Sequence, residues 1–383
     1  MSTFEFHTTK SIIVERDAAI NLAARVQAMD CASALIVTDP GVLGAQLLDR
    51  ALENFKQQHI AVNIFSEVLA DPPESVIYAG IAAAVAANAD CIIGFGGGSS
   101  MDVAKLIALL ARGSQELPEV YGVNQAKGPR LPLILVPTTA GTGSEVTAIA
   151  IVTTGENEKK GVVSPLLLPD IALLDARLTL GLPAPATAAT GIDAMVHAIE
   201  SYTSKRLKNP ISDALAKDAL RLLSANILTA CEHPNNIQAR ENMLLGACLA
   251  GMAFANAPVG GVHALAYPVG ARFHVPHGLS NSLMLGPVLR FNMSDAEALY
   301  AELADVVYPA AGGSNFRRAS MLIEYLQNIP AELGIATRLR DVGISNRDIP
   351  ALAADAMKQS RLLINNPREI QLNDALNLYK EAL

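Results

Sequence analysis

Short apolar runs alternate with longer amphipathic stretches through the first half of the chain. Four runs rich in β-branched residues predict buried strands, and these runs are residues 34–38, 62–65, 91–95 and 133–136. The stretches 42–59 and 73–88 between them predict helices. Strands that alternate with helices of this length are typical of a parallel sheet covered on both faces. Ligands of such sheets bind outside the carboxyl ends of the strands.

Long helical patterns replace the strand signals in the second half of the chain. They cover residues 211–231, 237–254 and 295–307. Pro210 suits the start of the first of these helices, because proline favours the first helical position. Ser294 is predicted to cap the third helix, and Pro309 lies just past its end.

A Pro-rich break near Pro183 and Pro185 lies where the strand signals end. We therefore predict a domain boundary at this break. The first domain is an α/β domain over residues 1–182, and the second is an all-helical domain over residues 183–383. Neither part contains an internal repeat or a low-complexity segment.

The stretch between Glu241 and Arg272 carries no charged residue, and its length alone would allow a membrane-spanning helix. Pro258, Gly260 and His263 interrupt the stretch, and polar groups inside a membrane are costly. The stretch therefore predicts a buried helix that runs into a loop, and we expect no membrane span.

Composition narrows the class of protein. Of the 383 residues, 51% are hydrophobic and 17% are charged, a balance that favours a compact globular protein. The net charge of -8 and the lack of a Lys/Arg run argue against a nucleic-acid partner or an anionic membrane surface. The four cysteines form no CxxC pair and the first residues do not resemble a signal peptide, so we expect a reducing cytoplasm.

A glycine loop, residues 94–105, follows the third predicted strand and opens a helix. Three consecutive glycines, residues 96–98, let the backbone approach a phosphate closely, and the helix start offers unpaired N–H groups. Ser99 or Ser100 is predicted to cap this helix. An ordinary strand–turn–helix corner is the alternative, because Ser99 stands where the Rossmann fingerprint has its third glycine.

A Thr-rich loop, residues 137–147, follows the fourth predicted strand. Its hydroxyl and backbone groups are suited to bind phosphate or ribose oxygens, although a polar turn with a helix cap is the alternative. Two such loops at the ends of two strands favour a bound nucleotide more than either loop does alone.

Asp39 lies directly after the first predicted strand. An acid in this place can accept hydrogen bonds from ribose hydroxyls and would repel the 2′-phosphate of NADP. Asp39 precedes the glycines instead of following them by about 20 residues, which predicts a nucleotide-binding topology different from the usual fingerprint. The alternative is a turn residue before Pro40 and Gly41.

The second half carries two groups of residues with metal-binding chemistry. Asp193 and His197 are four residues apart, a spacing that places both side chains on one helix face among apolar residues. A buried Asp needs a partner, although a surface Asp–His hydrogen bond is the alternative. Three of the seven histidines, His263, His274 and His277, lie within fifteen nearly uncharged residues. One carboxylate with two or three imidazoles suits Fe²⁺, Zn²⁺ or a similar metal.

These segments, in this order, resemble the iron-containing (group III) alcohol dehydrogenases over essentially the whole chain. The most specific matches are the glycine loop, the Thr-rich loop, the sequence from Asp193 to Glu200, and the sequence from His263 to Gly278. The resemblance implies the dehydroquinate synthase-like fold: an N-terminal α/β nucleotide-binding domain with a parallel sheet, an all-α C-terminal domain, and a cleft between them.

The resemblance also implies roles for individual residues. The implied metal ligands are Asp193, His197, His263 and His277. The implied cofactor-binding residues are Asp39, Gly96, Gly97, Gly98, Ser99, Asp102, Thr138, Thr139, Thr142, Thr147 and Lys160. The implied cofactors are NAD and Fe²⁺, with Zn²⁺ or another divalent metal as the alternative. A homodimer or a higher homo-oligomer is expected from the same resemblance.

One position departs from the family. Many members carry a further, non-ligand His four residues after the ligand that matches His263, and Tyr267 stands in that place here. An unperturbed Tyr pKa of about 10 makes a poor proton shuttle at neutral pH. Tyr267 and the nearby His274 are the candidate relay residues, and cofactor hydroxyls with water are the third route.

The resulting hypothesis is an NAD-dependent alcohol dehydrogenase or aldehyde reductase that acts on small primary alcohols or diols. The metal would polarise the substrate oxygen, and the nicotinamide would carry the hydride. Two alternatives keep the architecture: a hydroxyacid–oxoacid transhydrogenase, and a dehydroquinate synthase-like lyase, both with retained NAD. A non-enzymatic nucleotide-binding subunit gives no reason for the Asp and His residues.

Overall fold

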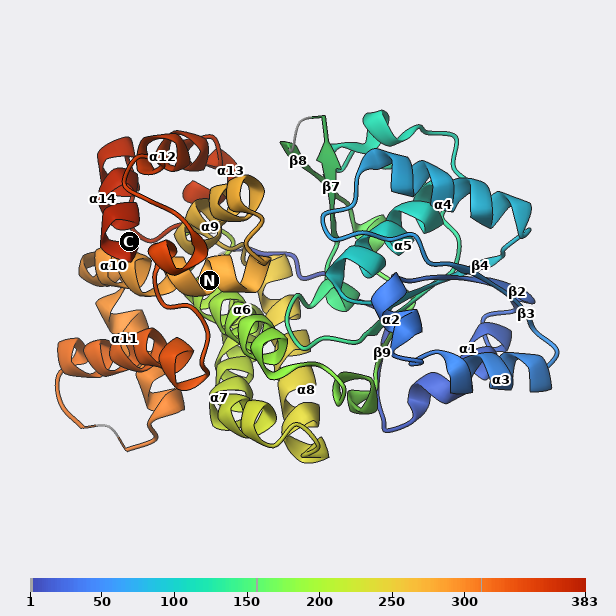
Figure 1. Cartoon of the computed structure of the whole chain (residues 1–383), viewed down its shortest axis with the longest axis horizontal. Helices are drawn as coiled ribbons and strands as arrows, with labels where there is room; N and C mark the ends of the chain where they lie inside the picture. Colours follow the sequence, from blue (N-terminus) through green and yellow to red (C-terminus); the bar gives the residue numbers. More distant parts are fainter. Residues whose placement is uncertain (1–2, 156–157, 311) are drawn as a thin grey trace. The chain divides into compact units, whose positions relative to one another are not determined.

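The computed structural model describes residues 3–155, 158–310 and 312–383. The chain forms two compact units (Figure 1). The α/β unit comprises His7–Thr139 and Gly143–Gly181. The helical unit comprises Met1–Phe6, Ala140–Thr142 and Leu182–Leu383. The two units are described separately below.

The α/β unit is built on a six-stranded sheet in which neighbouring strands run parallel. In spatial order its strands are β1 (Ser11–Val14), β9 (Ile171–Leu174), β6 (Leu133–Pro137), β4 (Cys91–Gly96), β2 (Ser33–Val37) and β3 (Ala61–Phe65). The four predicted strands are neighbours in this sheet, as expected. The sequence analysis missed β1 and β9, which have only four residues each.

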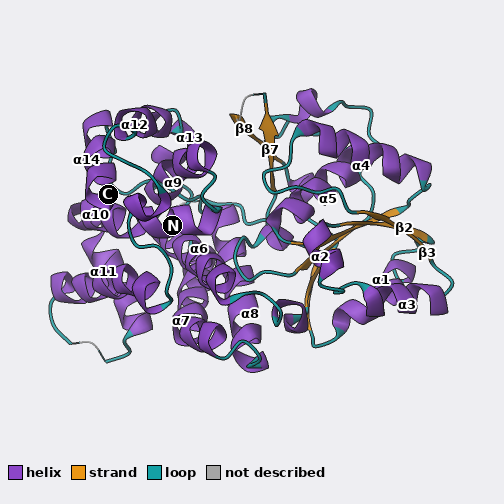
Figure 2. Ribbon diagram, in the orientation of Figure 1, coloured by secondary structure: helices purple, strands orange, loops and turns teal. Residues whose placement is uncertain are grey.

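Helices cover both faces of the sheet (Figure 2). α1 (Leu22–Gln27) and α3 (Asp49–Gln57) pack into one apolar cluster. α4 (Glu74–Ala86) and α5 (Gly98–Leu110) pack into the other. The prediction of a parallel sheet buried on both faces is therefore confirmed.

The prediction of one continuous helix over residues 42–59 is wrong. The structure divides it into α2 (Pro40–Gly44) and α3, with a turn between them. Gln46 adopts a left-handed backbone conformation in this turn, with φ of 57°. A non-glycine residue in that conformation cannot continue a right-handed helix, and this explains the break.

A second, small sheet was not predicted. β7 (Ile149–Thr154) pairs antiparallel with β8 (Glu158–Val163), and the two-residue strand β5 (Gly122–Val123) pairs with β8. The sequence of β8 begins with three charged residues, which explains why its pattern gave no strand signal. Short 3-10 helices complete the unit at Ala18–Asn21, Leu117–Val120, Ser144–Val146, Pro165–Leu167 and Ala176–Thr179.

Helices alone form the larger part of the helical unit. They are α6 (Ala184–Thr203), α7 (Pro210–Glu232), α8 (Ile237–Asn256), α9 (Gly261–Phe273), α10 (His277–Val307), α11 (Asn315–Glu332), α12 (Ile349–Met357), α13 (Ser360–Leu363) and α14 (Leu372–Ala382), with a 3-10 helix at Leu339–Val342. The predicted helices over residues 211–231 and 237–254 are confirmed. Pro210 is the first residue of α7, and the Asn209 side chain caps it.

Two predictions in this unit are wrong. The segment after Gly260 is not a loop but α9, and α10 begins at His277 instead of residue 295. Ser294 therefore lies inside α10, and it caps no helix start. Both helices contain an internal proline, Pro268 in α9 and Pro287 in α10, and both prolines are buried. Tertiary packing of their apolar neighbours offsets the cost of about 3 kcal/mol that an internal proline imposes.

Within the described residues, no single helix is both long enough and apolar enough to cross a membrane. α8 and α9 together have the length and the apolar composition of a membrane-spanning segment, but the chain bends by 106° between them.

Candidate functional site

α6 contributes the first two candidate metal ligands. Asp193 and His197 project from one face of this helix, and their side chains are only 2% and 4% exposed. The four-residue spacing stacks them one turn apart. Asp193 is not left without a partner, because its Oδ1 accepts a hydrogen bond from Asn281 Nδ2 on α10 at 2.6 Å.

α9 and α10 contribute the other two candidates. His263 lies in the first turn of α9 and is buried, whereas the side chain of His277, the first residue of α10, is 44% exposed. Gly278 allows the start of α10 to approach α6 closely. A Cβ atom at this position would lie 2.3 Å from the carbonyl oxygen of Ala189. The missing side chain therefore brings His277 next to Asp193.

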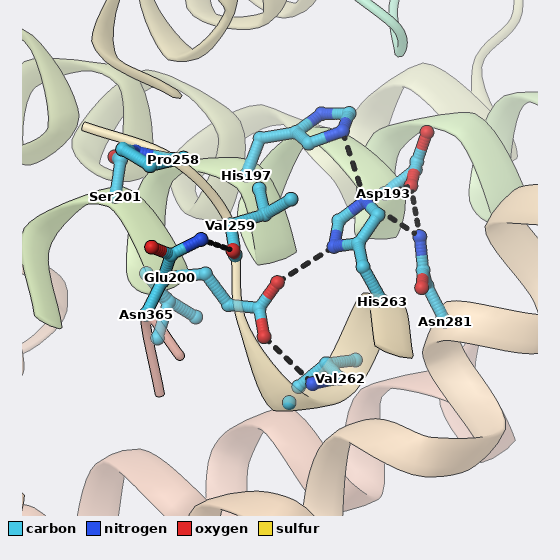
Figure 3. A network of polar contacts seen from close by, with 12 residues as sticks. Asp193, His197, Glu200, Ser201, Pro258, Val259, Val262, His263, Asn281 and Asn365 are labelled. Atoms are coloured by element: carbon cyan, nitrogen blue, oxygen red, sulfur yellow. Dashed lines mark hydrogen bonds and ion pairs between the residues drawn. The ribbon is translucent and has the colours of Figure 1, made fainter. Parts of the chain in front are cut away.

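The four predicted residues converge on one point, and Figure 3 shows three of them, Asp193, His197 and His263. One ligand atom from each lies within 4.8 Å of the ligand atoms of the others. His263 Nε2 is 3.1 Å from His197 Nε2 and 3.9 Å from Asp193 Oδ1. His277 Nε2 is 3.7 Å from the same carboxylate oxygen. A carboxylate and three imidazoles at these separations form a donor set suited to a divalent transition metal.

Glu200 fixes the orientation of His263. Its Oε2 accepts a hydrogen bond from His263 Nδ1 at 2.6 Å, and its Oε1 accepts one from the backbone N–H of Val262 at 2.7 Å (Figure 3). Because the ring proton lies on Nδ1, the lone pair of Nε2 points toward the other donors. Metal-binding histidines are commonly held in this way by a carboxylate.

Asn281 provides an independent indication of how the donor atoms are arranged. Its Nδ2 lies 2.6 Å from Asp193 Oδ1, 3.1 Å from His263 Nε2 and 3.3 Å from His277 Nε2. An amide nitrogen only donates and carries two hydrogens, so it can bond to at most two of these three atoms at once. The three atoms around it are of the kinds that bind a divalent transition metal.

Burial sets the protonation states at the site. Burial lowers the pKa of His197 to about 3, so its imidazole is neutral at physiological pH. For Asp193, burial raises the pKa, but the neighbouring imidazoles and the Asn281 amide outweigh it, and the net pKa is lowered. An ionised carboxylate and a neutral imidazole are the forms that bind metal without first losing a proton.

Aromatic rings surround the donors. Phe254 on α8 stacks on His197, with ring centroids 4.3 Å apart. Tyr267, one turn after His263 on α9, has its ring centroid 5.7 Å from that of His277 and 6.3 Å from that of His263. His274 is exposed at the C-cap of α9. Of the two candidate relay residues, the structure thus places Tyr267 beside the four donors.

The glycine loop of the α/β unit forms the turn between β4 and α5. Gly97 is the N-cap of α5 and no side chain caps the helix, so the predicted cap by Ser99 or Ser100 is wrong. Gly96 has φ of 153°, and a Cβ atom there would lie 2.7 Å from Ser100 Oγ. The first N–H groups of a helix have no partner within the helix, and phosphate-binding sites use such helix starts.

The Thr-rich loop lies next to the glycine loop. β6 pairs with β4 so that Pro137 is opposite Gly96, and Thr138 N donates to Gly96 O at 3.0 Å. A Cβ atom on Gly97 would lie 3.8 Å from Thr139 Oγ1. The carboxyl ends of two adjacent strands thus bring both predicted loops together. Thr142 groups with the helical unit.

Asp39 joins the same edge of the sheet from β2, the other neighbour of β4. Its Oδ1 accepts hydrogen bonds from Gly41 N and Val42 N, which caps α2 as the turn alternative predicts. Its Oδ2 accepts a hydrogen bond from Ser100 Oγ at 3.1 Å. The carboxylate is therefore held in place beside the glycine loop.

Three other predicted cofactor residues, Asp102, Thr147 and Lys160, contact groups of the protein itself. Asp102 and Thr147 are bonded within the protein: Asp102 Oδ1 accepts from Ser144 Oγ at 2.6 Å, and Thr147 Oγ1 accepts from Lys105 Nζ at 3.0 Å. Lys160 is an exposed residue of β8, and its Nζ lies 5.6 Å from the centroid of the Tyr121 ring.

Sequence reasoning missed Glu200, Asn281, Phe254 and Lys105. Glu200 did carry a signal, because it follows His197 by three residues and therefore extends the same helix face. Asn281 follows His277 by four residues on the face of α10 that approaches α6. Nothing in the local sequence indicates that Phe254 stacks on His197, since α8 and α6 are far apart in the chain.

The chain is similar to known proteins over almost its whole length. Residues 9–176 match the family "Iron-containing alcohol dehydrogenase", and residues 187–383 match "Fe-containing alcohol dehydrogenase family, C-terminal". Long-chain-alcohol dehydrogenase 1 of Geobacillus thermodenitrificans (strain NG80-2) is 36% identical over 368 residues, which is 94% of this chain and 92% of that protein.

Two solved structures extend the comparison. The crystal structure of a 1,3-propanediol oxidoreductase superposes with a TM-score of 0.96 at 33% identity, covering 100% of both chains. Sulfoacetaldehyde reductase from Bifidobacterium kashiwanohense, in complex with NAD⁺, superposes with a TM-score of 0.90 at 26% identity, covering 100% of this chain and 99% of the other. These matches span both units of the chain, and we conclude that it belongs to the iron-containing alcohol dehydrogenase family of oxidoreductases.

Proposed function

We propose that this protein is an NAD-dependent and divalent-metal-dependent enzyme that interconverts small primary alcohols or diols and the corresponding aldehydes. The convergence of Asp193, His197, His263 and His277 carries the proposal, because four donor atoms lie within 4.8 Å of one another and three of the four residues are buried. Membership of a family of alcohol dehydrogenases supports the reaction class.

The same four residues would hold the metal. Fe²⁺ is favoured by the family, and Zn²⁺ or another divalent ion is compatible with one carboxylate and three imidazoles. When bound, the metal would supply a Lewis acid that polarises the substrate oxygen. Asp193 would contribute the negative charge of the site, while Glu200 and Asn281 would orient the imidazole and carboxylate donors.

The exposure of the four side chains suggests where the substrate enters. Asp193, His197 and His263 are buried, whereas the side chain of His277 is 44% exposed. Substrate would therefore approach from the side of His277, beside the ring of Tyr267. In this place, Tyr267 would restrict the size of the substrate group that lies next to the reacting carbon.

The α/β unit would bind the NAD. α5 begins at Gly98, so the backbone N–H groups of Gly98 and Ser99 would bind a phosphate of the cofactor. Thr138 and Thr139 follow the adjacent strand β6 and would lie beside it. Asp39 would accept hydrogen bonds from the ribose and disfavour NADP. The complex of the sulfoacetaldehyde reductase with NAD⁺ supports this cofactor.

The substrate class is proposed at the level of primary alcohols and aldehydes. The relatives compared above are named for long-chain alcohols, 1,3-propanediol and sulfoacetaldehyde, which differ in length and charge. They share a terminal carbon at the alcohol or aldehyde oxidation level. Such a carbon can give up or accept a hydride, which is the chemistry that a metal and a nicotinamide would supply together.

The test is an anaerobic assay of chelator-treated protein with NAD(H), a panel of alcohols and aldehydes, and Fe²⁺ or Zn²⁺ added back. We expect net NADH formation from primary alcohols only after metal addition. His263→Ala and His277→Ala should lose both bound metal and turnover, while Glu324→Gln, an exposed control on α11, should keep both.

Two results would contradict the proposal. Near-normal turnover by metal-free His263→Ala or His277→Ala would exclude a role for the metal. Exchange of hydride between a hydroxy acid and an oxo acid, without net release of NADH, would indicate a transhydrogenase instead.

A further inference from the structure

α5 continues from the glycine loop to a lysine that is completely buried. Lys105 is 0% exposed, and its Nζ donates to Ser144 Oγ at 2.8 Å, to Thr147 Oγ1 at 3.0 Å and to Ile149 O at 2.7 Å. An ammonium group has three N–H donors, so each one has an acceptor. All three acceptors belong to the segment that ends the Thr-rich loop and begins β7.

Asp102 strengthens the same connection. It precedes Lys105 by three residues and therefore lies on the same face of α5. Its Oδ1 accepts from Ser144 Oγ at 2.6 Å and lies 3.6 Å from Lys105 Nζ, and its Oδ2 accepts from Ile151 N at 3.0 Å. Ser144 Oγ thus accepts from the lysine and donates to the aspartate, which fixes the direction of its hydrogen bond.

Nearby acidic side chains influence the charge of Lys105. Two carboxylates act on its ammonium, Asp102 and the buried Glu145. Burial lowers the pKa of Lys105, and these two carboxylates oppose the change. Burying an ammonium is costly unless it is paired and hydrogen-bonded. Loss of any partner would therefore disturb the local structure more than loss of a surface contact would.

The position of the group within the α/β unit suggests its purpose. The Thr-rich loop begins at β6, where Thr138 N bonds to Gly96 O of the glycine loop. The loop ends at Ser144 and Thr147, which bond to α5 through Lys105 and Asp102. Both ends of the loop are thus attached to the strand and helix that carry the glycines. Thr139, near the beginning, lies beside Gly97.

We propose that Lys105 is a positioning residue of the nucleotide site, which holds the Thr-rich loop in register with the glycine loop and thereby sets the affinity for NAD(H). The inference rests on the proposed function, because it assigns a purpose to the loops that would bind NAD. Asp102 and Thr147, which sequence reasoning assigned to cofactor contact, act here through Lys105.

Thr147 offers a matched pair of variants that tests this role. Thr147→Val keeps the shape of the side chain but removes the acceptor for Lys105, whereas Thr147→Ser keeps the hydroxyl and removes the methyl group. We expect Thr147→Val to weaken NADH binding about fivefold, as loss of one hydrogen bond predicts, and Thr147→Ser, which keeps the acceptor for Lys105, to weaken it less. A packing role would give the opposite order.

Lys105→Met tests the whole connection, and Lys56→Met, an exposed lysine of α3, is its control. We expect the dissociation constant for NADH, measured by fluorescence titration, to rise about 10- to 100-fold in Lys105→Met, as when an outer support of a binding site is removed. The metal content and the kcat at saturating NAD should change little, because the metal ligands lie in the helical unit.

The outcomes are separable. If the wild-type protein does not bind NADH, the proposed function fails and this inference fails with it. If the wild type binds NADH but Thr147→Val and Lys105→Met bind it equally well, only the inference is overturned. A fall in kcat with an unchanged KM for NAD would also overturn it. If Lys105→Met does not fold, the order of the two Thr147 variants still decides.

Discussion

The two candidate sites of this protein are built in opposite ways. In the helical unit, Asp193, His197, His263 and His277 direct their donor atoms at one another, and one amide nitrogen of Asn281 contacts three of them. In the α/β unit, polar side chains near the two loops bond to the scaffold instead. Asp102 and Thr147 are examples, since their oxygens bond within the protein.

The difference reflects the ligands that the two sites would bind. A metal ion needs side-chain lone pairs that converge within a few ångströms. A dinucleotide phosphate needs backbone N–H groups at a helix start, and side chains serve mainly to fix the loops that present them. Loss of a side chain should therefore have a larger direct effect in the helical unit than in the α/β unit.

The largest effect is expected from Asp193→Ala. Asp193 is the only anionic member of the four donors, and it is 2% exposed. Because four ligands together supply about 10–16 kcal/mol in structural zinc sites, loss of one, about 2.5–4 kcal/mol, should weaken metal binding roughly 100- to 1000-fold. Equilibrium dialysis with metal analysis measures this, and NADH affinity serves as the control. An equal loss of NADH affinity would remove the distinction between the two sites.

Glu145→Gln tests whether the ionisation of a buried carboxyl group in the α/β unit changes the stability of the protein. Burial raises the pKa of Glu145 to about 7 from its ordinary value of 4.5. The contribution of this carboxyl group to the free energy of unfolding is therefore complete below pH 4.5 and is lost as the pH rises through 7. At about 1.4 kcal/mol per pH unit, the wild type should lose about 3 kcal/mol of unfolding free energy that Glu145→Gln does not lose.

Urea unfolding followed by far-UV circular dichroism between pH 4.5 and 8 measures this difference. Glu53→Gln, an exposed glutamate of α3, is the matched control and should follow the wild-type profile. Parallel profiles for Glu145→Gln and the wild type would show that this carboxyl group titrates normally.

Glu200→Gln should have an intermediate effect on the metal site. The glutamine keeps the size of the side chain but no longer supplies the carboxylate that holds His263 Nδ1–H at 2.6 Å. Outer carboxylates of this kind contribute about 10- to 100-fold to metal affinity. A competitive chelator titration measures the loss, with Glu324→Gln as the control. Unchanged affinity would mean that His263 keeps its orientation without Glu200.

Asp39→Asn should have the smallest effect and should change preference instead of overall binding. The amide keeps an oxygen that can cap α2 but removes the charge that would repel a 2′-phosphate. We expect NADPH affinity to rise about tenfold relative to NADH, which corresponds to about 1.4 kcal/mol. Fluorescence titration with both dinucleotides measures the ratio. No change in the ratio would indicate that Asp39 only caps α2.

The sequence predicted the parts that depend on local pattern. The four runs that became β2, β3, β4 and β6 were rich in β-branched residues, and the loops after them contained the glycines and threonines. The proximity of the four candidate ligands followed from the family resemblance, because Asp193 and His277 are 84 residues apart and nothing local relates them.

The sequence did not predict features that depend on tertiary packing. α9 was expected to be a loop because of Pro258, Gly260 and His263, but burial against neighbouring helices stabilises it. The hydrogen bond between Glu200 and His263 joins residues 63 positions apart. Lys105 looked like an ordinary helix residue, and only the folded structure shows that three acceptors from another segment surround its ammonium.

Anomalous X-ray diffraction at the iron edge, from crystals grown anaerobically with Fe²⁺, tests the central claim most directly. We expect one anomalous-difference peak per chain, about 2.0–2.2 Å from an oxygen of Asp193 and from a ring nitrogen of each of His197, His263 and His277. A peak at any other place, or no peak in crystals whose dissolved protein turns over alcohol, would contradict it.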